Sequence, residues 1–323
     1  MTKLYEDNRP RTKEEIIGQE SAVEKFFALL DNGLVQDFLF SGPSGCGKTT
    51  AARVAAMYLW PDVWEDRYHE FNASDDRGIN FIRNQIKELA QFSYPKIIVL
   101  DEADSMTEDA YEALRKPLEG TPSSSSIFIL CVNDDTKVLP AIKSRCLLVK
   151  FKPLSSEDVW TVMMNVLEAQ GVEYDTEDEK VRQIFENTAI IADGDLRMAI
   201  QELAAYIKIE GDIWTLNLDR PLEPAPNVSY LERAIQIAIE GNLKDSVHHV
   251  EDALIVDRII PDRAVKQAYD YIKTLQDDTA KAEILHRLAE LDKDLRSSYP
   301  LIQYAGFLGY VWLVGSGTQK VAP

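Results

Sequence analysis

Apolar and polar positions follow two alternating patterns in the first half of the chain. Short apolar runs that stop at polar or turn-forming residues predict buried strands at 38–40, 97–100, 127–132 and 147–151. Apolar residues spaced three or four apart predict helices at 21–30, 48–59, 77–92 and 108–119. Strands that alternate with helices are typical of a parallel sheet covered on both faces. We therefore predict an α/β domain over residues 1–153, which Pro153 closes.

The pattern of the second half is helical. It begins at Ser155, which forms a helix N-cap signature with Asp158, and continues to about residue 209. Three prolines indicate a linker at 217–227. Further helices are predicted at 229–240, 243–254, 261–275, 279–297 and 301–314. We expect one helical domain over residues 154–215 and a second over residues 225–323.

Composition and charge limit the classes of protein that fit this pattern. An apolar fraction of 45% with 28% charged residues is typical of a folded, soluble protein. The net charge is −19, of which −5 falls on residues 1–153 and −14 on residues 154–323. This balance excludes a protein that coats itself with nucleic acid, so any DNA contact must be local and lie in the first half. Solubility, or adaptation to high salt in a halophilic or viral source, explains the acidity as well as a functional role does.

Cysteine spacing and apolar segments predict the compartment. Cys46, Cys131 and Cys146 lie far apart, without the paired spacing of a zinc site or a disulfide framework. The N-terminal residues contain no apolar signal segment. The apolar segment 299–317 is interrupted by Pro300 and is short for a bilayer span. We expect a buried C-terminal helix, no membrane contact, and a cytoplasmic location, or a nuclear one in a eukaryotic source.

The strongest chemical motif follows the first predicted strand. It has the spacing G-x-x-x-x-G-K-[ST] and consists of Gly42, Pro43, Ser44, Gly45, Cys46, Gly47, Lys48 and Thr49. Glycines let backbone N–H groups surround phosphate oxygens, and the following helix N-terminus adds positive potential. We expect Lys48 to reach the β- and γ-phosphates of ATP and Thr49 to hold Mg²⁺, with Thr50 beside them. The alternative is a chance glycine-rich turn, which the flanking strand and helix disfavour.

Two carboxylates and a carboxamide follow later strands of the predicted sheet. Asp101 and Glu102 follow the strand 97–100, and Asn133 follows the strand 127–132. Ligands of parallel sheets bind at this edge. We expect Asp101 to hold Mg²⁺, Glu102 to polarise the attacking water and Asn133 to orient that water. Surface carboxylates and a turn asparagine are the alternatives.

The order and local sequences of these motifs resemble AAA+ ATPases and, among them, the small subunit of replication factor C in its archaeal and eukaryotic branch. The segments that carry the resemblance are 6–10, 16–19, 72–79, 101–104, 113–116, 144–146 and 194–200. The triplet Ser144-Arg145-Cys146 before a strand is the most discriminating of them. The resemblance implies a P-loop AAA+ ATPase domain, a helical lid domain and an all-α collar domain, in the three ranges given above.

The resemblance also implies residue roles that spacing alone does not. Arg145 would be an arginine finger that reaches the γ-phosphate of a neighbouring subunit, and Arg197 would contact the γ-phosphate of its own subunit from the lid. The residues expected around the adenine and ribose are Ile16, Ile17, Gly18 and Arg9. An ordinary salt-bridged arginine is the alternative for Arg145.

DNA and protein partners are implied in the same way. A helix beginning at Arg77 would follow the template-strand backbone with Arg77, Asn80, Arg83, Asn84 and Lys87. Such phosphate contacts are independent of sequence, and a solvated basic helix face is the alternative. The implied function is that of a clamp-loader subunit in a pentameric ring with a large subunit. The ring would bind and hydrolyse ATP to open a sliding clamp and place it on primed DNA, and five subunits would multiply a weak DNA contact.

Three departures from the family pattern concern the nucleotide pocket and its coupling to DNA. Asp7 and Asn8 stand in place of a Lys-Tyr pair, and Tyr111 stands in place of a glutamine. Pro117 should kink or end the helix 108–119.

Two other functions remain open from the sequence. The first is an AAA+ initiator or Holliday-junction motor, although residues 217–323 lack the basic winged helix that such proteins usually append. The second is a structural ring subunit that binds ATP without hydrolysing it. The intact Lys48, Glu102 and Arg145 argue against that second function.

Overall fold

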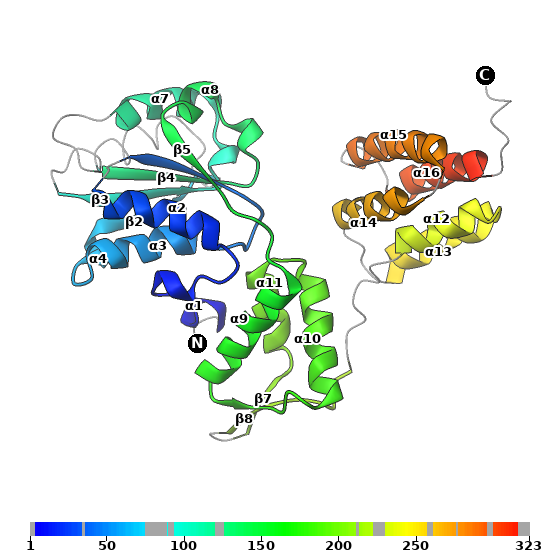
Figure 1. Ribbon diagram of the computed structural model, residues 1–323, viewed down its shortest axis with the longest axis horizontal. Helices are drawn as coiled ribbons and strands as arrows, with labels where there is room; N and C mark the ends of the chain where they lie inside the picture. Colours follow the sequence, from blue (N-terminus) through cyan, green and yellow to red (C-terminus); the bar gives the residue numbers. More distant parts are fainter. Residues whose placement is uncertain are drawn as a thin grey trace. The chain divides into compact units, whose positions relative to one another are not determined.

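A computed structural model describes residues 4–33, 36–74, 89, 94–119, 126–210, 213–221, 230–256, 261–275, 277–295 and 300–315. The chain forms two compact units, residues 1–221 and 222–323. The first unit contains a five-stranded sheet with helices on both faces, followed by a smaller part that is mainly helical (Figure 1). In the described residues, no helix combines the length and hydrophobicity that a membrane span requires.

Five parallel strands form the main sheet of the first unit. In spatial order they are β2 (Tyr68–Asn72), β3 (Lys96–Asp101), β4 (Ser126–Val132), β1 (Asp37–Ser41) and β5 (Cys146–Lys150). Leu39 of β1 is in register with Leu130 on one side and with Leu148 on the other. The predicted parallel sheet is therefore confirmed, and its core strands lie close to the predicted positions. The sequence pattern did not predict β2, an edge strand that has no buried residue.

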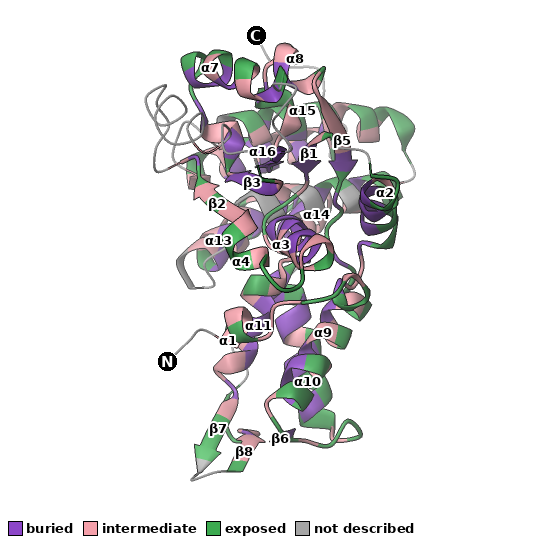
Figure 2. Ribbon diagram, turned by 90° about the vertical axis from the view of Figure 1, so that its left-hand side faces the viewer, coloured by how far each residue is buried: buried purple, intermediate pink, exposed green. Residues whose placement is uncertain are grey.

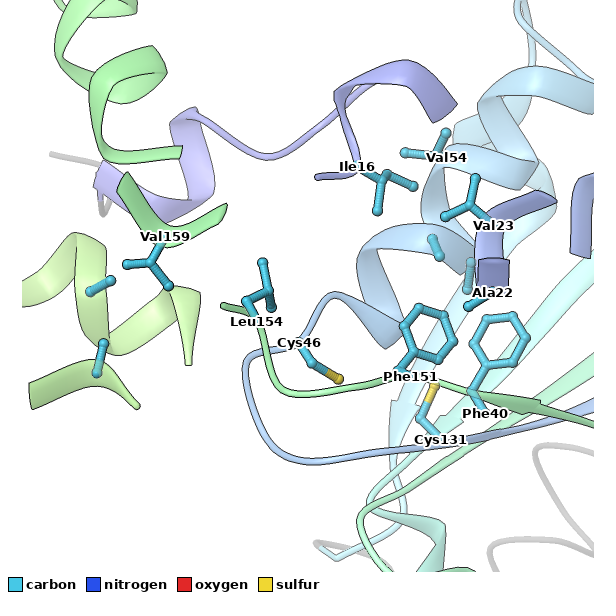
Figure 3. Close-up of a cluster of buried hydrophobic side chains, with 14 of the residues drawn as sticks. Ile16, Ala22, Val23, Phe40, Cys46, Val54, Cys131, Phe151, Leu154 and Val159 are labelled. Carbon is cyan, nitrogen blue, oxygen red and sulfur yellow. The ribbon is translucent and has the colours of Figure 1, made fainter. Parts of the chain in front are cut away.

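One face of this sheet is covered by helices α2 (Glu20–Asp31) and α3 (Lys48–Leu59). Phe38 and Phe40 of β1 point to this face and join the same hydrophobic cluster, part of which Figure 3 shows. Phe26 of α2 contacts both of their rings edge-on, with centroids 4.8 and 4.9 Å apart. This packing fixes the strand from which the phosphate loop leaves.

The opposite face packs against helices α7 (Glu108–Glu119) and α8 (Pro140–Lys143). Leu39 lies between Phe38 and Phe40 in sequence but faces this second cluster, as the period of two in a strand requires. Figures 1 and 2 both show α7 and α8 on the side of the sheet away from α3. Helix α7 has the predicted bounds, and Pro117 lies in its last turn.

After β5 the chain forms the smaller part of the first unit. Its helices are α9 (Ser156–Ala169), α10 (Glu179–Ala192) and α11 (Leu196–Ala204). The predicted N-cap is confirmed, since Ser155 and Asp158 form a reciprocal capping box at the start of α9. Three short strands form a second sheet in the order β6 (Val172–Glu173), β8 (Ile213–Leu216) and β7 (Ile207–Glu210). The expectation that helix continues to about residue 209 is wrong, because apolar and polar residues alternate there with the period of a strand.

In its described part, the second unit consists of helices. They are α12 (Tyr230–Ile239), α13 (Leu243–Val256), α14 (Pro261–Thr274), α15 (Asp278–Asp294) and α16 (Pro300–Gly315). Residues such as Ile235, Leu288 and Leu308 bury their side chains in one hydrophobic cluster. The buried hydroxyl of Ser246 donates to the carbonyl oxygen of Ala234 at 2.7 Å and thereby joins α13 to α12. The predicted helices of this region are confirmed, with ends that differ by a few residues.

Candidate functional site

The loop between β1 and α3 has the backbone conformation of a phosphate-binding loop. Gly45 and Gly47 have φ values of +65° and +97°, which residues with a Cβ rarely adopt. Gly47 is also the N-cap of α3, so the unpaired N–H groups of the first helical turn open toward the loop. A Cβ on Gly45 would lie 1.8 Å from a carboxylate oxygen of Asp195. This glycine therefore also permits the close approach of α11.

Lys48 places its ammonium group within the loop. Its Nζ donates to the carbonyl oxygens of Gly42 and Pro43, each at 2.7 Å, and to Oδ1 of Asn133 at 3.1 Å. The residue is only 7% exposed, so its charge is directed at the loop and not at bulk solvent. The structure thus brings together the loop, its lysine and the carboxamide that follows β4.

Thr49 and two acidic residues lie next to this lysine. The Oγ1 of Thr49 donates to Oδ2 of Asp101 at 3.3 Å. Glu102 has a φ of +51°, and its backbone N–H donates to Oδ1 of Asp101 at 2.9 Å. A residue other than glycine seldom occupies this left-handed region, and such conformations concentrate at functional sites. Asp104 accepts from the backbone N–H of Asn133 at 3.3 Å and so ties the end of β4 to the segment after β3.

A cavity of about 420 Å³ opens beside these groups, within the first unit. The predicted site residues that line it are Arg9, Ile16, Ile17, Ser44, Gly45, Cys46, Gly47, Lys48, Thr49, Thr50, Asp101, Glu102, Asn133 and Arg197. Gly42 and Pro43 do not line it, although their carbonyl oxygens accept from Lys48. Gly18 lies in a turn outside the lining, where its N–H donates to Oε1 of Glu20 at 3.1 Å.

Part of the lining comes from helix α9, in which the sequence offered no motif. One face of α9 contributes Val162, Asn165, Val166 and Ala169. Their spacing of three, four and seven residues is that of any amphipathic helix face, so it indicates burial and not a ligand. Tyr5 from the short helix α1 (Leu4–Asp7) and Ile200 from α11 also line the cavity.

Arg197 enters the cavity from the first turn of α11. Its guanidinium lies over the ring of Tyr5, 5.7 Å from the centroid. The backbone N–H of Leu196 donates to the carbonyl oxygen of Gly45 at 3.1 Å, and Asp195 caps the helix by accepting from Met198 N–H at 3.0 Å. The start of α11 is therefore fixed directly to the phosphate loop.

The departures at Asp7 and Asn8 do not remove this part of the pocket. Asn8 lines the cavity, and its Oδ1 accepts from Nε2 of Gln170 at 3.3 Å. Its Nδ2 donates to the carbonyl oxygen of Leu4 at 2.8 Å. Arg9 forms an ion pair with Glu6 at 3.4 Å. The N-terminal segment thus lies at the cavity, with polar groups that differ from the Lys-Tyr pair of the family pattern.

The two thiols nearest the site are neutral packing groups. Burial raises the pKa of Cys46, although the charge of Lys48 opposes this shift. Its Sγ donates to the carbonyl oxygen of Pro43 at 3.0 Å. Burial also raises the pKa of Cys131 well above its ordinary value. Because the thiolate is the nucleophile and metal ligand, we exclude cysteine chemistry and assign the chemistry to oxygen ligands and cationic nitrogens.

The donor set fits a nucleotide with Mg²⁺. A hydroxyl and a carboxylate oxygen, from Thr49 and Asp101, are ligands that Mg²⁺ prefers, and they already lie within hydrogen-bond distance of each other. The cavity volume lies in the range of small-molecule sites. Helix N–H groups and the Lys48 ammonium supply the positive potential that phosphates require.

One predicted site residue lies elsewhere. Arg145 does not line the cavity and lies in the turn between α8 and β5, where its side chain is 26% exposed. The residues predicted to contact DNA are outside the described residues, namely Arg77, Asn80, Arg83, Asn84 and Lys87.

Comparisons with known proteins extend this picture over the whole chain. A family model described as DNA polymerase III, delta subunit, matches residues 69–155. A protein named replication factor C small subunit from Archaeoglobus fulgidus is 32% identical over 313 residues, which cover 95% of this chain and 96% of that relative. Proteins of the same name from Methanocella arvoryzae and Haloarcula marismortui are 29% and 32% identical, over 98% and 89% of this chain and 98% and 87% of their own lengths.

Solved structures show the fold. A structure of the Thermotoga maritima RuvB Holliday junction branch migration motor is similar with a TM-score of 0.52 at 16% sequence identity. The match covers 98% of this chain and 93% of that one. At this identity the likeness establishes the arrangement of helices and strands alone.

Proposed function

This chain belongs to the family of replication factor C small subunits, and we propose that it is an ATPase subunit of a clamp loader, which uses ATP to open a sliding clamp and place it on primed DNA. The observation that carries the proposal is the arrangement of Lys48, Thr49, Asp101 and Glu102 around one cavity. These are the groups that phosphoryl transfer requires. Family membership supports the proposal that they act within a clamp-loader complex.

In the proposed site, each polar group has one task. Thr49 and Asp101 would hold Mg²⁺, which supplies positive charge to the phosphate oxygens when it is bound. Lys48 exchanges its carbonyl partners for the β- and γ-phosphate oxygens of ATP. Glu102 accepts a proton from the attacking water, and Asn133 orients that water.

The remaining contacts come from the two ends of the first unit and from a second subunit. Ile16 and Ile17 enclose the adenine with Arg9 near the ribose, while Gly18 shapes the turn behind them. Arg197 contacts the γ-phosphate from α11. Arg145, which lies away from the cavity of its own chain, is supplied to the nucleotide of an adjoining subunit.

This function divides the chain into three parts. Residues 1–153 form the ATPase domain, residues 154–215 the lid and residues 225–323 a collar that joins subunits. The partners are other loader subunits, a sliding clamp and the backbone of primer-template DNA. The residues proposed to contact that backbone are Arg77, Asn80, Arg83, Asn84 and Lys87. The proposed role locates the chain in the compartment that contains the DNA.

The likeness to RuvB raises the alternative of a Holliday-junction motor. The described part of residues 222–323 contains only helices packed around one cluster, and a winged-helix reader would add strands there. We therefore favour the clamp loader.

The test measures ATP hydrolysis by the complex assembled with its partner subunits. Primed DNA and the clamp are added separately and then together. Stimulation by both together supports the loader, whereas the same rate with and without the clamp contradicts it. In the same assay Arg145→Ala should leave ATP binding intact and reduce turnover by orders of magnitude. A full rate in that variant would contradict the role in trans.

A further inference from the structure

The guanidinium of Arg145 is held at two points on the surface of the first unit. Its Nη2 donates to Oε1 of Glu119 at 2.6 Å, and its Nη1 donates to the carbonyl oxygen of Ala141 at 2.7 Å. Its Nε is buried and, within the described residues, has no hydrogen-bond partner. The two bonds fix the plane of the guanidinium, and they leave one hydrogen on Nη1 and one on Nη2 for an outside acceptor.

Glu119 is not the residue that its own helix favours. It is the last residue of α7, where the helix dipole places partial negative charge and disfavours a carboxylate. Lys116, in the same turn, follows the ordinary preference for a cation. The Glu119 side chain is also 52% exposed, so packing does not require it. Its charge also acts on Arg115, four residues earlier on α7, but its hydrogen bond goes to Arg145 on a separate element.

A second ion pair on α7 gives a direct comparison. Arg115 and Glu112 are three residues apart on one helix, with nitrogen and oxygen 2.8 Å apart and side chains that are 40% and 55% exposed. Such a pair contributes little beyond surface charge. Glu119 and Arg145 join two separate elements instead, and the Arg145 side chain is less exposed, at 26%. Their contact therefore fixes the position of the Arg145 side chain.

We infer that Glu119 is a positioning residue for Arg145 and presents its guanidinium to the nucleotide of the adjoining subunit. The inference rests on the proposed role of Arg145 in trans. An arginine side chain that is ordered in advance loses less conformational freedom when it meets the γ-phosphate, so more of its interaction stabilises the transition state. Glu119 does not line the cavity of its own chain, so its effect on turnover is exerted through Arg145.

The test measures ATP turnover by the assembled complex with clamp and primed DNA. Glu119→Ala should lower kcat about ten-fold and leave KM for ATP nearly unchanged, because a misplaced finger affects the transition state and not ATP binding. Glu119→Gln keeps an acceptor oxygen at the same reach and should recover much of the loss. The matched control Glu112→Ala removes the other pair on α7 and should keep both constants at wild-type values.

A double substitution shows whether Glu119 acts through Arg145. Glu119→Ala combined with Arg145→Ala should lose no more turnover than Arg145→Ala alone. An unchanged kcat in Glu119→Ala overturns the inference, and so does a higher kcat, which would make Glu119 a restraint on the finger. Native mass spectrometry checks ring composition. If the alanine variant does not assemble, Glu119→Asp carries the test, because its shorter side chain should lower kcat. A wild-type kcat in Glu119→Asp would contradict the need for that reach.

The two proposals fail in different ways. If Arg145→Ala turns over ATP at the wild-type rate, the role in trans is wrong. If Arg145→Ala is crippled while Glu119→Ala has normal turnover, only the role of Glu119 is wrong.

Discussion

Asp37 predicts a pH dependence of stability in the first unit. It begins β1, and its Oδ1 accepts from the backbone N–H of Phe128 at 2.8 Å, with Cys146 as its partner on β5. Burial raises the pKa of Asp37 from its ordinary value of 3.8 to about 7, against the opposing effect of the Phe128 hydrogen bond. The folded chain thus holds this proton more tightly than the unfolded chain. Stability should fall as pH rises from about 4 to about 7 and change little above that.

Removing the charge should restore the lost stability. A rise in pKa from 3.8 to about 7 corresponds to about 4 kcal/mol if it acted in full. Asp37 keeps some contact with solvent, which screens part of this free energy, so we expect Asp37→Asn to stabilise the unit by about 2 kcal/mol near pH 8. At about pH 4 the two proteins should be nearly equal. The carboxamide oxygen of asparagine can still accept from Phe128.

Urea unfolding between about pH 4 and about pH 8 measures this difference. Trp312 of the second unit is replaced by phenylalanine in every protein, so that the fluorescence comes from the tryptophans of the first unit. Asp62→Asn, at an exposed position of the same unit, is the matched control and should follow the parent at each pH. The reasoning is refuted if the advantage of Asp37→Asn stays constant or shrinks as pH rises.

Three further changes test the site. Lys48→Ala should abolish ATP binding or turnover. Rings that mix Lys48→Ala chains with Arg145→Ala chains should regain part of the hydrolysis rate, because the Lys48→Ala chain supplies the arginine finger and the Arg145→Ala chain supplies the ATP site. Mixed rings without such recovery would contradict the supply of Arg145 to a neighbouring subunit. Gly45→Ala combines an unfavourable φ with a clash against Asp195, so nucleotide affinity measured by fluorescence titration should drop at least ten-fold, and unchanged affinity would contradict the loop geometry. Tyr111→Phe removes a buried hydroxyl that donates to the carbonyl oxygen of Ala103 at 2.5 Å. Urea unfolding should therefore show a loss of about 1 to 2 kcal/mol in the free energy of unfolding, and equal stability would contradict a stabilising role for this hydrogen bond.

The sequence predicted those elements in which pattern and burial agree. Helix α3 has the predicted bounds because the phosphate-loop motif marks its start and Pro61 follows its end, whereas α7 has them because its apolar stripe is clear. Strand β2 was missed because His69, Glu70 and Asn72 make it polar, as an edge strand can be. Strand β7 was missed because a run of four residues is too short to separate from the end of a helix by periodicity.

The site was predictable where the chemistry depends on a motif within one segment. The phosphate loop and the Asp101-Glu102 pair were found in this way, and the structure brings them together. The wall formed by α9 and Tyr5 could not be found, because apolar side chains at helical spacing are the same whether they cover a core or a ligand. The partner of Arg145 could not be found either, since Glu119 is 26 residues away in the chain.

In the proposed ring, the contacts at the two ends of helix α7 would concern two different nucleotides. Near its start, Tyr111 is bonded to the carbonyl oxygen of Ala103, the residue after Glu102. At its end, Glu119 accepts a hydrogen bond from Arg145. Glu119 lies eight residues after Tyr111, so a rigid segment of helix about 12 Å long joins these two points. If cleavage of the γ-phosphate displaces the backbone at Ala103, this helix would carry the displacement to Arg145 and so to the neighbouring subunit. ATP hydrolysis would then pass from one subunit to the next in a fixed direction.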